Sequence, residues 1–335
     1  MRWIRQLTKP LANLYVCRPL LAIFEVCLRC NSACGYCDLP LNEGRYEMMR
    51  REIRRVFSHL YQEGLRFLFV QGGEPLVRRD LPEILEDLAD LGFHLTLITN
   101  GTKFTETLVE RLILLQVSIS ISVDTLDRQR YQRIRGRDQL SEVLHGIKLL
   151  KNYPHPRYLT CIVSNLNRHD AIDIARFARA RGFIPVIGAY HWDVDRYGKV
   201  DLTLQYPRPV ARKVFEEILD SGLVPPGYFR RYLRDNIDWL DGKSLASCDA
   251  GKYSIAIDAS GNVAPCLALK HAGNLLDTSL PDIVAKFDKA SIRSCSDKSS
   301  CNMLCSRVIG SALWHPLEAF QTPQSVTPTG ALHAG

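Results

Sequence analysis

The chain has 335 residues, of which 46% are hydrophobic and 24% are charged, and its formal net charge is +7. Such a composition is ordinary for a globular protein, and the length suffices for one large domain or for a large and a small one. No apolar run is long enough to cross a bilayer, and Pro10, Asn13 and Arg18 interrupt the apolar core that a signal peptide would need. We therefore expect a cytoplasmic protein. No basic repeat interleaved with aromatic residues indicates a nucleic-acid partner.

Residues 1–20 form a basic segment without an acidic residue. Apolar side chains recur in this segment at helical spacing, which predicts an amphipathic helix. Such a helix can lie on a membrane surface and handle a lipid substrate, but we favour a helix that packs on the body of the protein, because Pro10 interrupts the pattern. Two further arginine clusters, at 50–55 and 128–137, are interpreted as solvated helix faces.

From residue 21 onward, short apolar runs alternate with longer amphipathic segments. The apolar runs predict strands at 21–27, 66–71, 93–99, 117–123, 157–164 and 183–189. The amphipathic segments predict helices at 47–63, 81–91, 104–115, 139–152 and 169–181. Repeated strand–helix units indicate a parallel sheet with right-handed crossovers. Six such strands could form an open, doubly wound sheet or an incomplete barrel.

The run 117–123 distinguishes between these two architectures. Its residues alternate strictly between apolar side chains and the hydroxyls of Ser118, Ser120 and Ser122. A central strand of a doubly wound sheet is usually apolar on both faces, whereas one hydroxyl-lined face suits a barrel interior that holds a polar ligand. We therefore predict an α/β fold with a partial (β/α)6 TIM-like barrel. Its chemistry is expected at the carboxyl ends of the strands.

The pattern changes after residue 190. Helical segments near 207–221 and 228–240 lead to "YSIAIDASGNVAPC", which predicts a hairpin with Gly261 and Asn262 at its turn. We expect the barrel and the helices that follow it to occupy residues 21–240, and a small cysteine-bearing domain to occupy residues 241–310. Residues 311–335 are expected to form a flexible tail, because their end is rich in Pro, Thr, Ser and Gly.

Nine of the eleven cysteines lie in two groups, four within 27–37 and five within 248–305. In a reducing compartment thiols stay free, so clustered cysteines indicate metal binding rather than disulfides. Cys30, Cys34 and Cys37 directly follow the first predicted strand, where a site is expected. Three thiolates can hold three irons of a four-iron cluster and leave the fourth iron open to a ligand. A zinc site is the alternative, and Cys27 fits better as a strand residue than as a ligand.

The cysteine triplet is part of a wider pattern. The spacing Cys30-x3-Cys34-x2-Cys37, with Tyr36 before the third cysteine, and "GGEP" at 72–75 one strand later resemble the motifs of radical S-adenosylmethionine (radical SAM) enzymes. The resemblance covers roughly residues 20–190 and implies a [4Fe–4S] cluster on the three cysteines, with SAM bound to its open iron. It also implies contacts to SAM from Tyr36, Gly72, Gly73, Glu74, Asn100, Ser122 and Arg135.

Within this resemblance each residue has an expected role. Tyr36 would lie against the adenine, and the glycines and Glu74 would meet the amino group of SAM. Asn100 and Ser122 would contact the ribose or the methionine portion, and Arg135 would pair with the carboxylate. Simple packing of Ser122 and a solvated Arg135 at a helix end stay open as alternatives. An electron from a donor such as flavodoxin or ferredoxin would cleave SAM, and the resulting 5′-deoxyadenosyl radical would abstract a substrate hydrogen atom.

The C-terminal cysteines carry a second resemblance, to the SPASM domain, an auxiliary-cluster module that follows many such barrels. The cysteine spacing of that domain matches the spacing of Cys248, Cys266, Cys295, Cys301 and Cys305. Two cysteines of the motif are absent: Ile292 stands at one position, and no cysteine follows Cys305. Two clusters ligated only by cysteine would need eight thiolates, so we expect at least one auxiliary [4Fe–4S] cluster. Which four of the five bind it stays open, and a structural zinc is the alternative.

The SPASM resemblance leaves several substrate classes open. Only 29 residues precede Cys30, which is too few for an N-terminal domain that binds a precursor peptide. We therefore favour a small biosynthetic metabolite that is oxidised, epimerised or coupled, over a ribosomal peptide or a lipid. A non-catalytic iron–sulfur or zinc protein is the alternative of another class, but such a protein would have no reason to keep "GGEP" after the second strand.

Overall fold

One curved sheet of nine strands organises the chain in the computed structural model, which describes residues 2–42, 44–191, 202–245, 248–297 and 301–321. Its strands lie in the order β6-β5-β4-β3-β2-β1-β7-β8-β9. Their bounds are β1 Leu21–Cys27, β2 Phe67–Gly72, β3 His94–Thr99, β4 Ser118–Ser122, β5 Arg157–Val163, β6 Ile184–Ala189, β7 Ser254–Ile257, β8 Asn262–Ala264 and β9 Gly273–Asn274. All pairs from β6 to β7 are parallel, and the last two are antiparallel. The six predicted barrel strands are confirmed.

Helices fill the connections between the parallel strands and surround the C-terminal part. Their bounds are α1 Arg2–Tyr15, α2 Arg50–Gln62, α3 Leu81–Asp90, α4 Glu106–Leu114, α5 Arg128–Arg135, α6 Leu140–Leu149, α7 Ala171–Ala180, α8 Arg208–Asp220, α9 Tyr228–Leu240, α10 Leu280–Ala285, α11 Lys289–Asp297, α12 Val308–Trp314 and α13 Pro316–Gln321. Each helix predicted between residues 47 and 240 is present. Within the described part of the chain, none of the helices has both the length and the apolar content that a bilayer crossing needs.

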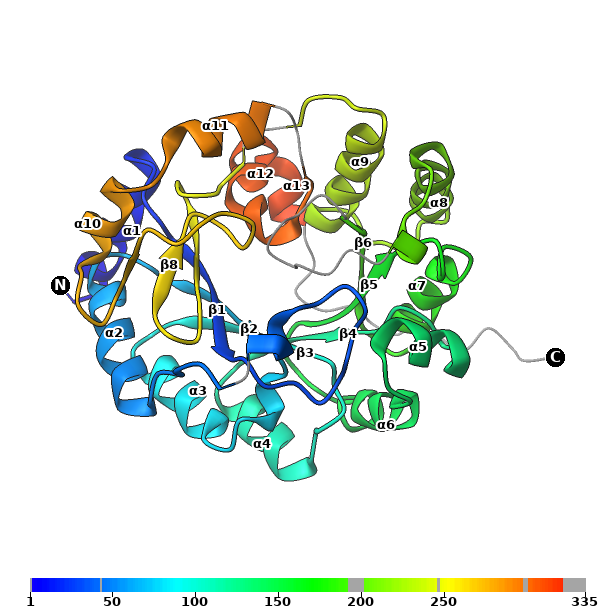
Figure 1. Ribbon diagram of the computed structural model, residues 1–335, viewed down its shortest axis with the longest axis horizontal. Coiled ribbons are helices and arrows are strands. Elements are labelled where there is room, and N and C mark those ends of the chain that lie inside the picture. Colours follow the sequence, from blue (N-terminus) through cyan, green and yellow to red (C-terminus); the bar gives the residue numbers. More distant parts are fainter. Residues whose placement is uncertain (1, 43, 192–201, 246–247, 298–300, 322–335) are drawn as a thin grey trace.

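The helices of the strand–helix units pack against one face of the sheet. In β1, Ala22, Phe24 and Val26 belong to the large core shared with these helices, whereas Leu21 and Ile23 face the opposite side. Figure 1 shows α2 to α8 around the outside of the curved sheet. A doubly wound sheet carries helices on both faces. The one-sided arrangement therefore confirms the predicted partial barrel.

The serine face of β4 points into the barrel, as the alternating pattern predicts. Ile119 and Ile121 are buried in the helix-side core. On the inner face, the Ser120 hydroxyl lies 2.8 Å from the Thr160 hydroxyl of β5, and Ser122 lines an internal cavity. The inner surface at this end of the sheet is therefore polar and can receive a polar ligand.

The C-terminal strands extend the barrel sheet. β7 pairs in parallel with β1, and Ile23 lies opposite Ala256. On the inner face these two residues pack with Leu267 in a second buried cluster, which partly buried Met303 and Ile309 complete. The boundary expected near residue 240 is therefore not a break in the sheet, because the C-terminal part supplies both the next strand and a cover for the inner face of β1.

The hairpin turn lies earlier than the sequence predicted. The Asp258 N–H donates to the Asn262 carbonyl at 2.9 Å, so Asn262 is already the first paired residue of β8. Gly261 has a φ of 90° and makes the turn together with the residues before it. Only glycine adopts this conformation readily, so the glycine was identified correctly and the asparagine was not.

The flexible tail expected from residue 311 is wrong for its first part. Apart from His315, residues 311–321 belong to α12 and α13. Two contacts explain the order: the buried Asp249 carboxylate accepts N–H groups at the start of α12, and Glu318 of α13 lies 3.2 Å from the more exposed Arg234 of α9. The rest of the expected tail, residues 322–335, lies outside the described residues.

Helix α1 packs on the body of the protein, as favoured from the sequence. The Asn13 side chain is buried and donates to the carbonyls of Glu63, at the end of α2, and of Pro19. The Lys9 ammonium adds a 3.8 Å contact to the Glu63 carboxylate. Pro10 is accommodated within the helix, and α1 is therefore fastened at its C-terminal half.

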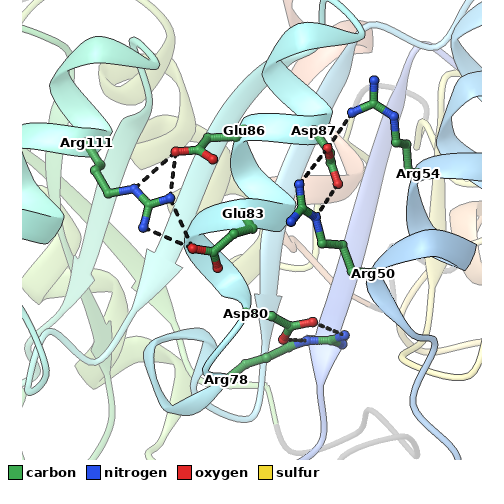
Figure 2. Close-up of polar contacts among 8 residues, drawn as sticks. All are labelled: Arg50, Arg54, Arg78, Asp80, Glu83, Glu86, Asp87 and Arg111. Atoms are coloured by element: carbon green, nitrogen blue, oxygen red, sulfur yellow. Dashed lines mark hydrogen bonds and ion pairs between the residues drawn. The ribbon is translucent and has the colours of Figure 1, made fainter.

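Ion pairs on the outer face join α2, α3 and α4. Figure 2 shows Arg50 and Arg54 directed at Asp87, and Arg111 directed at Glu83 and Glu86. The Asp87 side chain is 8% exposed, whereas those of Arg50 and Arg54 are 44% and 50% exposed. Hydrogen bonds from these arginines lower the pKa of Asp87. The solvated face expected at 50–55 is thus only half correct, because two of its arginines hold a neighbouring helix.

Arg78 joins three segments beneath the barrel rim. Its guanidinium is 6% exposed and donates to the Val26 carbonyl at 2.6 Å and to the Met48 carbonyl at 2.8 Å. Asp80 balances its charge at 2.8 Å (Figure 2). The segment that follows β2 is thereby fixed to the end of β1 and to the entrance of α2. Sequence reasoning did not identify this residue.

The backbones at the ends of β1 and β2 are in direct contact, with no side chain between them. The Gly73 N–H donates to the Cys27 carbonyl, and the Glu74 N–H donates to the Arg29 carbonyl, both at 2.8 Å. A Cβ atom on Gly73 would lie 2.1 Å from the Arg29 oxygen, and one on Gly72 would lie 2.3 Å from the Cys27 oxygen. The glycines were expected to let a ligand come close to the backbone. In the structure they let the end of β1 come close.

Substitution of Gly73 with alanine should therefore destabilise the fold strongly. The added methyl group meets backbone rather than a flexible side chain, so we expect a loss of about 3 kcal/mol in the free energy of unfolding. Chemical denaturation of the purified variant measures this loss. Gly222→Ala is the matched control, because nothing lies within 4 Å of its Cβ position and its φ is 66°. That control should lose only about 1 kcal/mol, and an equal loss in both variants would contradict the close approach.

Candidate functional site

The carboxyl ends of the first four strands surround a cavity of about 210 Å³. Its lining includes every residue expected at the barrel site, namely Cys30, Cys34, Tyr36, Cys37, Gly72, Gly73, Glu74, Asn100, Ser122 and Arg135. These residues come from the loop after β1, from the ends of β2, β3 and β4, and from the end of α5. The fold brings them together at the edge of the sheet where ligands of parallel α/β proteins bind.

The loop that carries the cysteine triplet is fastened to the end of α5. The Ala33 N–H donates to the Arg135 carbonyl at 2.9 Å, and the Gly35 N–H donates to the Ile134 carbonyl at 3.4 Å. Gly136 ends the helix with a φ of 71°, and a Cβ there would lie 2.1 Å from the Ala33 oxygen. The loop and the helix end are thus in backbone contact.

The same loop is fastened to the end of β3 by side chains. The Asn100 carboxamide donates to the Asn31 side-chain oxygen at 2.8 Å and to the Ser32 hydroxyl at 3.2 Å. Asn31 in turn donates to the Thr102 hydroxyl at 2.8 Å. Asn100 lines the cavity, but its donors are engaged with the cysteine loop. The sequence identified Asn100 but did not identify its hydrogen-bond partners, Asn31 and Ser32.

Glu74 is a buried carboxylate with three internal donors. It is 1% exposed. One oxygen accepts from the Thr99 hydroxyl at 2.5 Å and from the Leu76 N–H at 3.0 Å, and the other accepts from the Asn100 N–H at 2.6 Å. Burial raises the pKa of Glu74, and these hydrogen bonds oppose the rise. The carboxylate therefore binds the end of β2 to the end of β3 as well as facing the cavity.

Arg135 is paired inside the protein. Its guanidinium lies 2.7 Å from the Asp124 carboxylate, and the two side chains are 9% and 1% exposed. The other Asp124 oxygen accepts the Ile162 N–H at 2.9 Å. Within the described residues, Nε of Arg135 has no hydrogen-bond partner. A solvated Arg135 at a helix end is therefore wrong, because the guanidinium is buried and paired with Asp124.

Tyr36 and Cys27 occupy different surroundings. Tyr36 lines the cavity and meets Tyr190 edge-on, with ring centroids 5.9 Å apart. Cys27 ends β1, is fully buried and donates its thiol hydrogen to the Glu74 carbonyl at 3.3 Å. The thiol of Cys27 thus has a carbonyl partner in the wall between β1 and β2 and does not line the cavity.

The thiols of the triplet are partly buried and close enough to interact. Burial raises the pKa of Cys30 to about 11 and that of Cys37 to about 12, and Cys34 contributes to both shifts. Among the described residues, no three His, Cys, Asp or Glu side chains converge as ligands of one metal ion would. In a four-iron cluster each thiolate binds a different iron, so the ligands surround a space. Three thiols around a cavity fit that group better than a zinc ion.

The five C-terminal thiols also form one group. The Cys266 thiol interacts with those of Cys248, Cys305 and Cys295, and Cys301 shares a hydrogen bond with Cys295. Burial raises the pKa of Cys266 to about 12 and that of Cys305 to about 11. All eleven cysteines of the chain are free thiols. The fold therefore gathers five thiols that stand far apart in the sequence.

Asp249 joins the segment of Cys248 to the start of α12. Its carboxylate is 1% exposed and accepts the N–H groups of Ile309 and Gly310, both at 2.8 Å, where α12 begins. Burial raises its pKa to about 6. The Asp249 N–H and the Cys248 thiol both donate to the Ser306 carbonyl. Cys248 is thus kept beside the segment of Cys305, through a residue that sequence reasoning missed.

Two family comparisons match separate parts of the chain. Residues 24–178 match the Radical SAM superfamily, and residues 248–307 match the SPASM family, described as an iron–sulfur cluster-binding domain. Solved structures agree in fold alone. SuiB from Streptococcus suis bound to its precursor peptide SuiA superposes with a TM-score of 0.68 at 19% identity, over 86% of this chain and 70% of that one. The enzyme anSMEcpe with bound AdoMet gives a TM-score of 0.63 at 18% identity, over 83% and 84%.

Several curated relatives match about half of the chain. A probable GTP 3′,8-cyclase of Pyrococcus abyssi is 34% identical over 152 residues, which are 44% of this chain and 49% of the relative. The PqqA peptide cyclase of Granulibacter bethesdensis is 28% identical over 168 residues, which are 49% and 45%. The chain thus spans about half the length of the curated relatives it matches. The two family matches thus assign a Radical SAM domain to residues 24–178, which carry the thiol triplet, and an iron–sulfur cluster-binding SPASM domain to residues 248–307, which carry the second thiol group.

Proposed function

We propose that the chain is a radical SAM enzyme that abstracts a hydrogen atom from a small, polar biosynthetic metabolite, which it oxidises, epimerises or couples. The observation that carries the proposal is the single cavity lined by the cysteine triplet, Glu74 and Arg135. The polar inner face beside it, with the Ser120 and Thr160 hydroxyls, supports a hydrophilic substrate. An electron donor such as flavodoxin or ferredoxin in a reducing, cytoplasmic environment suits the eleven free thiols.

We assign the first cluster to Cys30, Cys34 and Cys37. The loop between these thiols is fastened on two sides, so the thiols are held around the cavity before a cluster enters. When bound, the cluster and SAM supply a reductive cleavage whose 5′-deoxyadenosyl radical takes a hydrogen atom from the substrate. The protein contributes position and the exclusion of water.

The SAM contacts follow from the charges that line the cavity. We assign the Glu74 side, with the backbone of Gly72 and Gly73, to the amino group, because a buried carboxylate favours an ammonium partner. We assign the free Nε of Arg135 to the SAM carboxylate. Tyr36 would cover the adenine, while Asn100 and Ser122 would face the ribose or the methionine portion from the strand ends.

We assign the five C-terminal thiols to at least one auxiliary [4Fe–4S] cluster in the part from residue 241 to about residue 310. The mutual contacts of Cys248, Cys266 and Cys305 support these three as ligands. The hydrogen bond between Cys301 and Cys295 supports the remaining ligand or ligands from that pair. This part covers the inner face of β1, where it can reach a substrate at the barrel mouth.

A peptide substrate is the second candidate, and the specific observation in its favour is the match to a peptide cyclase. A lipid substrate at a membrane surface is less favoured, because the described half of α1 is fastened to α2 by Asn13 and Lys9. Anaerobic reconstitution followed by an assay for 5′-deoxyadenosine tests the SAM chemistry itself. A protein that binds iron but does not cleave SAM would be a non-catalytic iron–sulfur protein.

Replacement of Cys30, Cys34 and Cys37 with alanine should abolish 5′-deoxyadenosine formation. The loss follows because no iron could then present an open position in the barrel, while the C-terminal thiols would still hold about four irons. Chromatography of the reaction and iron analysis of the variant measure both results. Cys27→Ala is the matched control and should retain cleavage, since its thiol bonds a carbonyl. Cleavage by the triple variant would remove the triplet from the site.

Glu74→Gln should weaken SAM binding about tenfold, because a neutral amide loses the charge-assisted bond to the amino group. Equilibrium dialysis of the reconstituted protein measures the affinity. Glu47→Gln is the control, since Glu47 also accepts a backbone N–H, from Leu28 at 2.8 Å, without lining the cavity. Unchanged affinity in Glu74→Gln would restrict that carboxylate to its internal bonds.

Replacement of Cys248 and Cys266 together with serine should lower bound iron by about four atoms per chain. SAM cleavage should continue without coupled product, because these thiols stand outside the barrel cavity. Iron analysis and the deoxyadenosine assay measure the two effects. Wild-type protein that retains about four irons and one zinc would contradict the auxiliary-cluster assignment and leave the barrel assignment intact.

A further inference from the structure

A second cavity, of about 370 Å³, lies between the cysteine loop and the C-terminal hairpin. Glu25 of β1 and Asp258 at the end of β7 both line it. Phe24 pairs with Ile257 across these parallel strands. Glu25 and Asp258 are the next residues along the two strands, so their carboxylates lie on neighbouring strands. Both belong to the inner face, because Glu25 is two residues after Ile23 and side chains alternate along a strand.

The second cavity adjoins the first. Leu39 lines both of them. Glu25, in the second cavity, pairs across the sheet with Gln71, which lines the first. Both cavities therefore open at the same edge and on the same face of the sheet. A molecule in the second cavity would be the immediate neighbour of SAM in the first, as hydrogen-atom transfer requires.

Backbone contacts fix the two sides of this cavity relative to each other. The Met48 N–H donates to the Ala259 carbonyl at 2.8 Å, and the Ser260 hydroxyl donates to the Tyr46 carbonyl at 2.5 Å. Leu28, Leu39 and Ala259 form a small buried cluster against which Cys37 packs. The cavity is thus built by the fold, and its apolar wall is shared with the triplet.

The charges that line the cavity favour a cation. Three carboxylates line it, from Glu25, Asp38 and Asp258, against one guanidinium, from Arg45, and the imidazole of His271. Glu25 is 1% exposed. Asp258 is oriented by the N–H groups of Ser260 and Asn262, at 2.9 and 2.8 Å. Fixed carboxylates attract ammonium groups and repel phosphates at short range.

We propose that this second cavity is the substrate site and that it selects a polar molecule with a protonated amine over a nucleoside triphosphate. The amine is either that of a free metabolite or that of a side chain in a peptide, since both present the same ammonium. Arg45 is available to a carboxylate or hydroxyl elsewhere on the same molecule. This inference rests on the proposed function and names its substrate class. It also separates the chain from relatives named for GTP.

Calorimetry on the reconstituted, SAM-loaded protein tests the proposal with three probes: spermidine, a lysine-containing hexapeptide and GTP. We expect at least one amine probe to bind and GTP not to bind. Glu25→Gln and Asp38→Asn should each weaken amine binding about tenfold, as the loss of one charge-assisted contact predicts. Glu83→Gln removes a carboxylate from the outer ion pairs of α3 and should leave amine binding unchanged. The relative affinity of spermidine and the peptide identifies the source of the amine.

Three results would overturn the proposal: GTP binding as tight as that of the amines, no binding by either amine, or amine affinity unchanged in both Glu25→Gln and Asp38→Asn. Thermal melting of each variant shows that its fold is intact, and Asp38→Asn alters only a partly exposed side chain. Formation of 5′-deoxyadenosine is measured on the same samples. Absence of SAM cleavage counts against the proposed function, whereas intact cleavage with GTP bound counts against the substrate class alone.

Discussion

Backbone contact between the ends of β1 and β2 is the constraint on which the rest of the site depends. Because Gly72 and Gly73 lack side chains, the chain after β2 can donate hydrogen bonds to the carbonyls of Cys27 and Arg29. This contact determines where the cysteine loop starts and where Glu74 lies. Arg78 supports it from below through the Val26 carbonyl. The motif is therefore a structural element of the barrel before any ligand is considered.

The cysteine loop is held by three parts of the fold at once. Backbone bonds join it to α5, Asn100 joins it to β3, and Glu74 joins β3 to β2. Such fastening keeps the ligands in place before the cofactor arrives, which lowers the entropy lost on binding. Partial burial raises the pKa of Cys30 and of Cys37, so a cluster that binds there would have to displace their protons. The fixed positions of the thiols thus favour cluster uptake, whereas the protons that they carry oppose it.

Much of the barrel could be predicted from the sequence, because its strands are long apolar runs with a clear period. The ten cavity residues were identifiable because they lie at strand ends or in a spaced motif, as for Glu74 and Arg135. Their partners were not, since Asp124, Thr99 and Asp249 lie in no pattern and gain their meaning from burial beside a distant residue. The helical order of 311–321 was missed for the same reason, because its cap, Asp249, stands some sixty residues earlier. Composition indicates where a turn or a tail can occur, but tertiary contacts decide whether such a segment is ordered.

The pairing of β7 with β1 has a consequence for how the chain folds as it is made. β1 ends at residue 27 and β7 begins at residue 254, so 226 residues separate the two partners. At about 5–20 residues per second, the open edge of β1 waits roughly 10–50 s on the ribosome for its neighbour. During that time its apolar inner face, with Leu21 and Ile23, also lacks the cover that Ala256 and Leu267 later supply. An unpaired apolar strand edge is a template for aggregation. The first strand to be made is therefore among the last to be completed, and the nascent barrel is most vulnerable at the strand that leads into its cysteines.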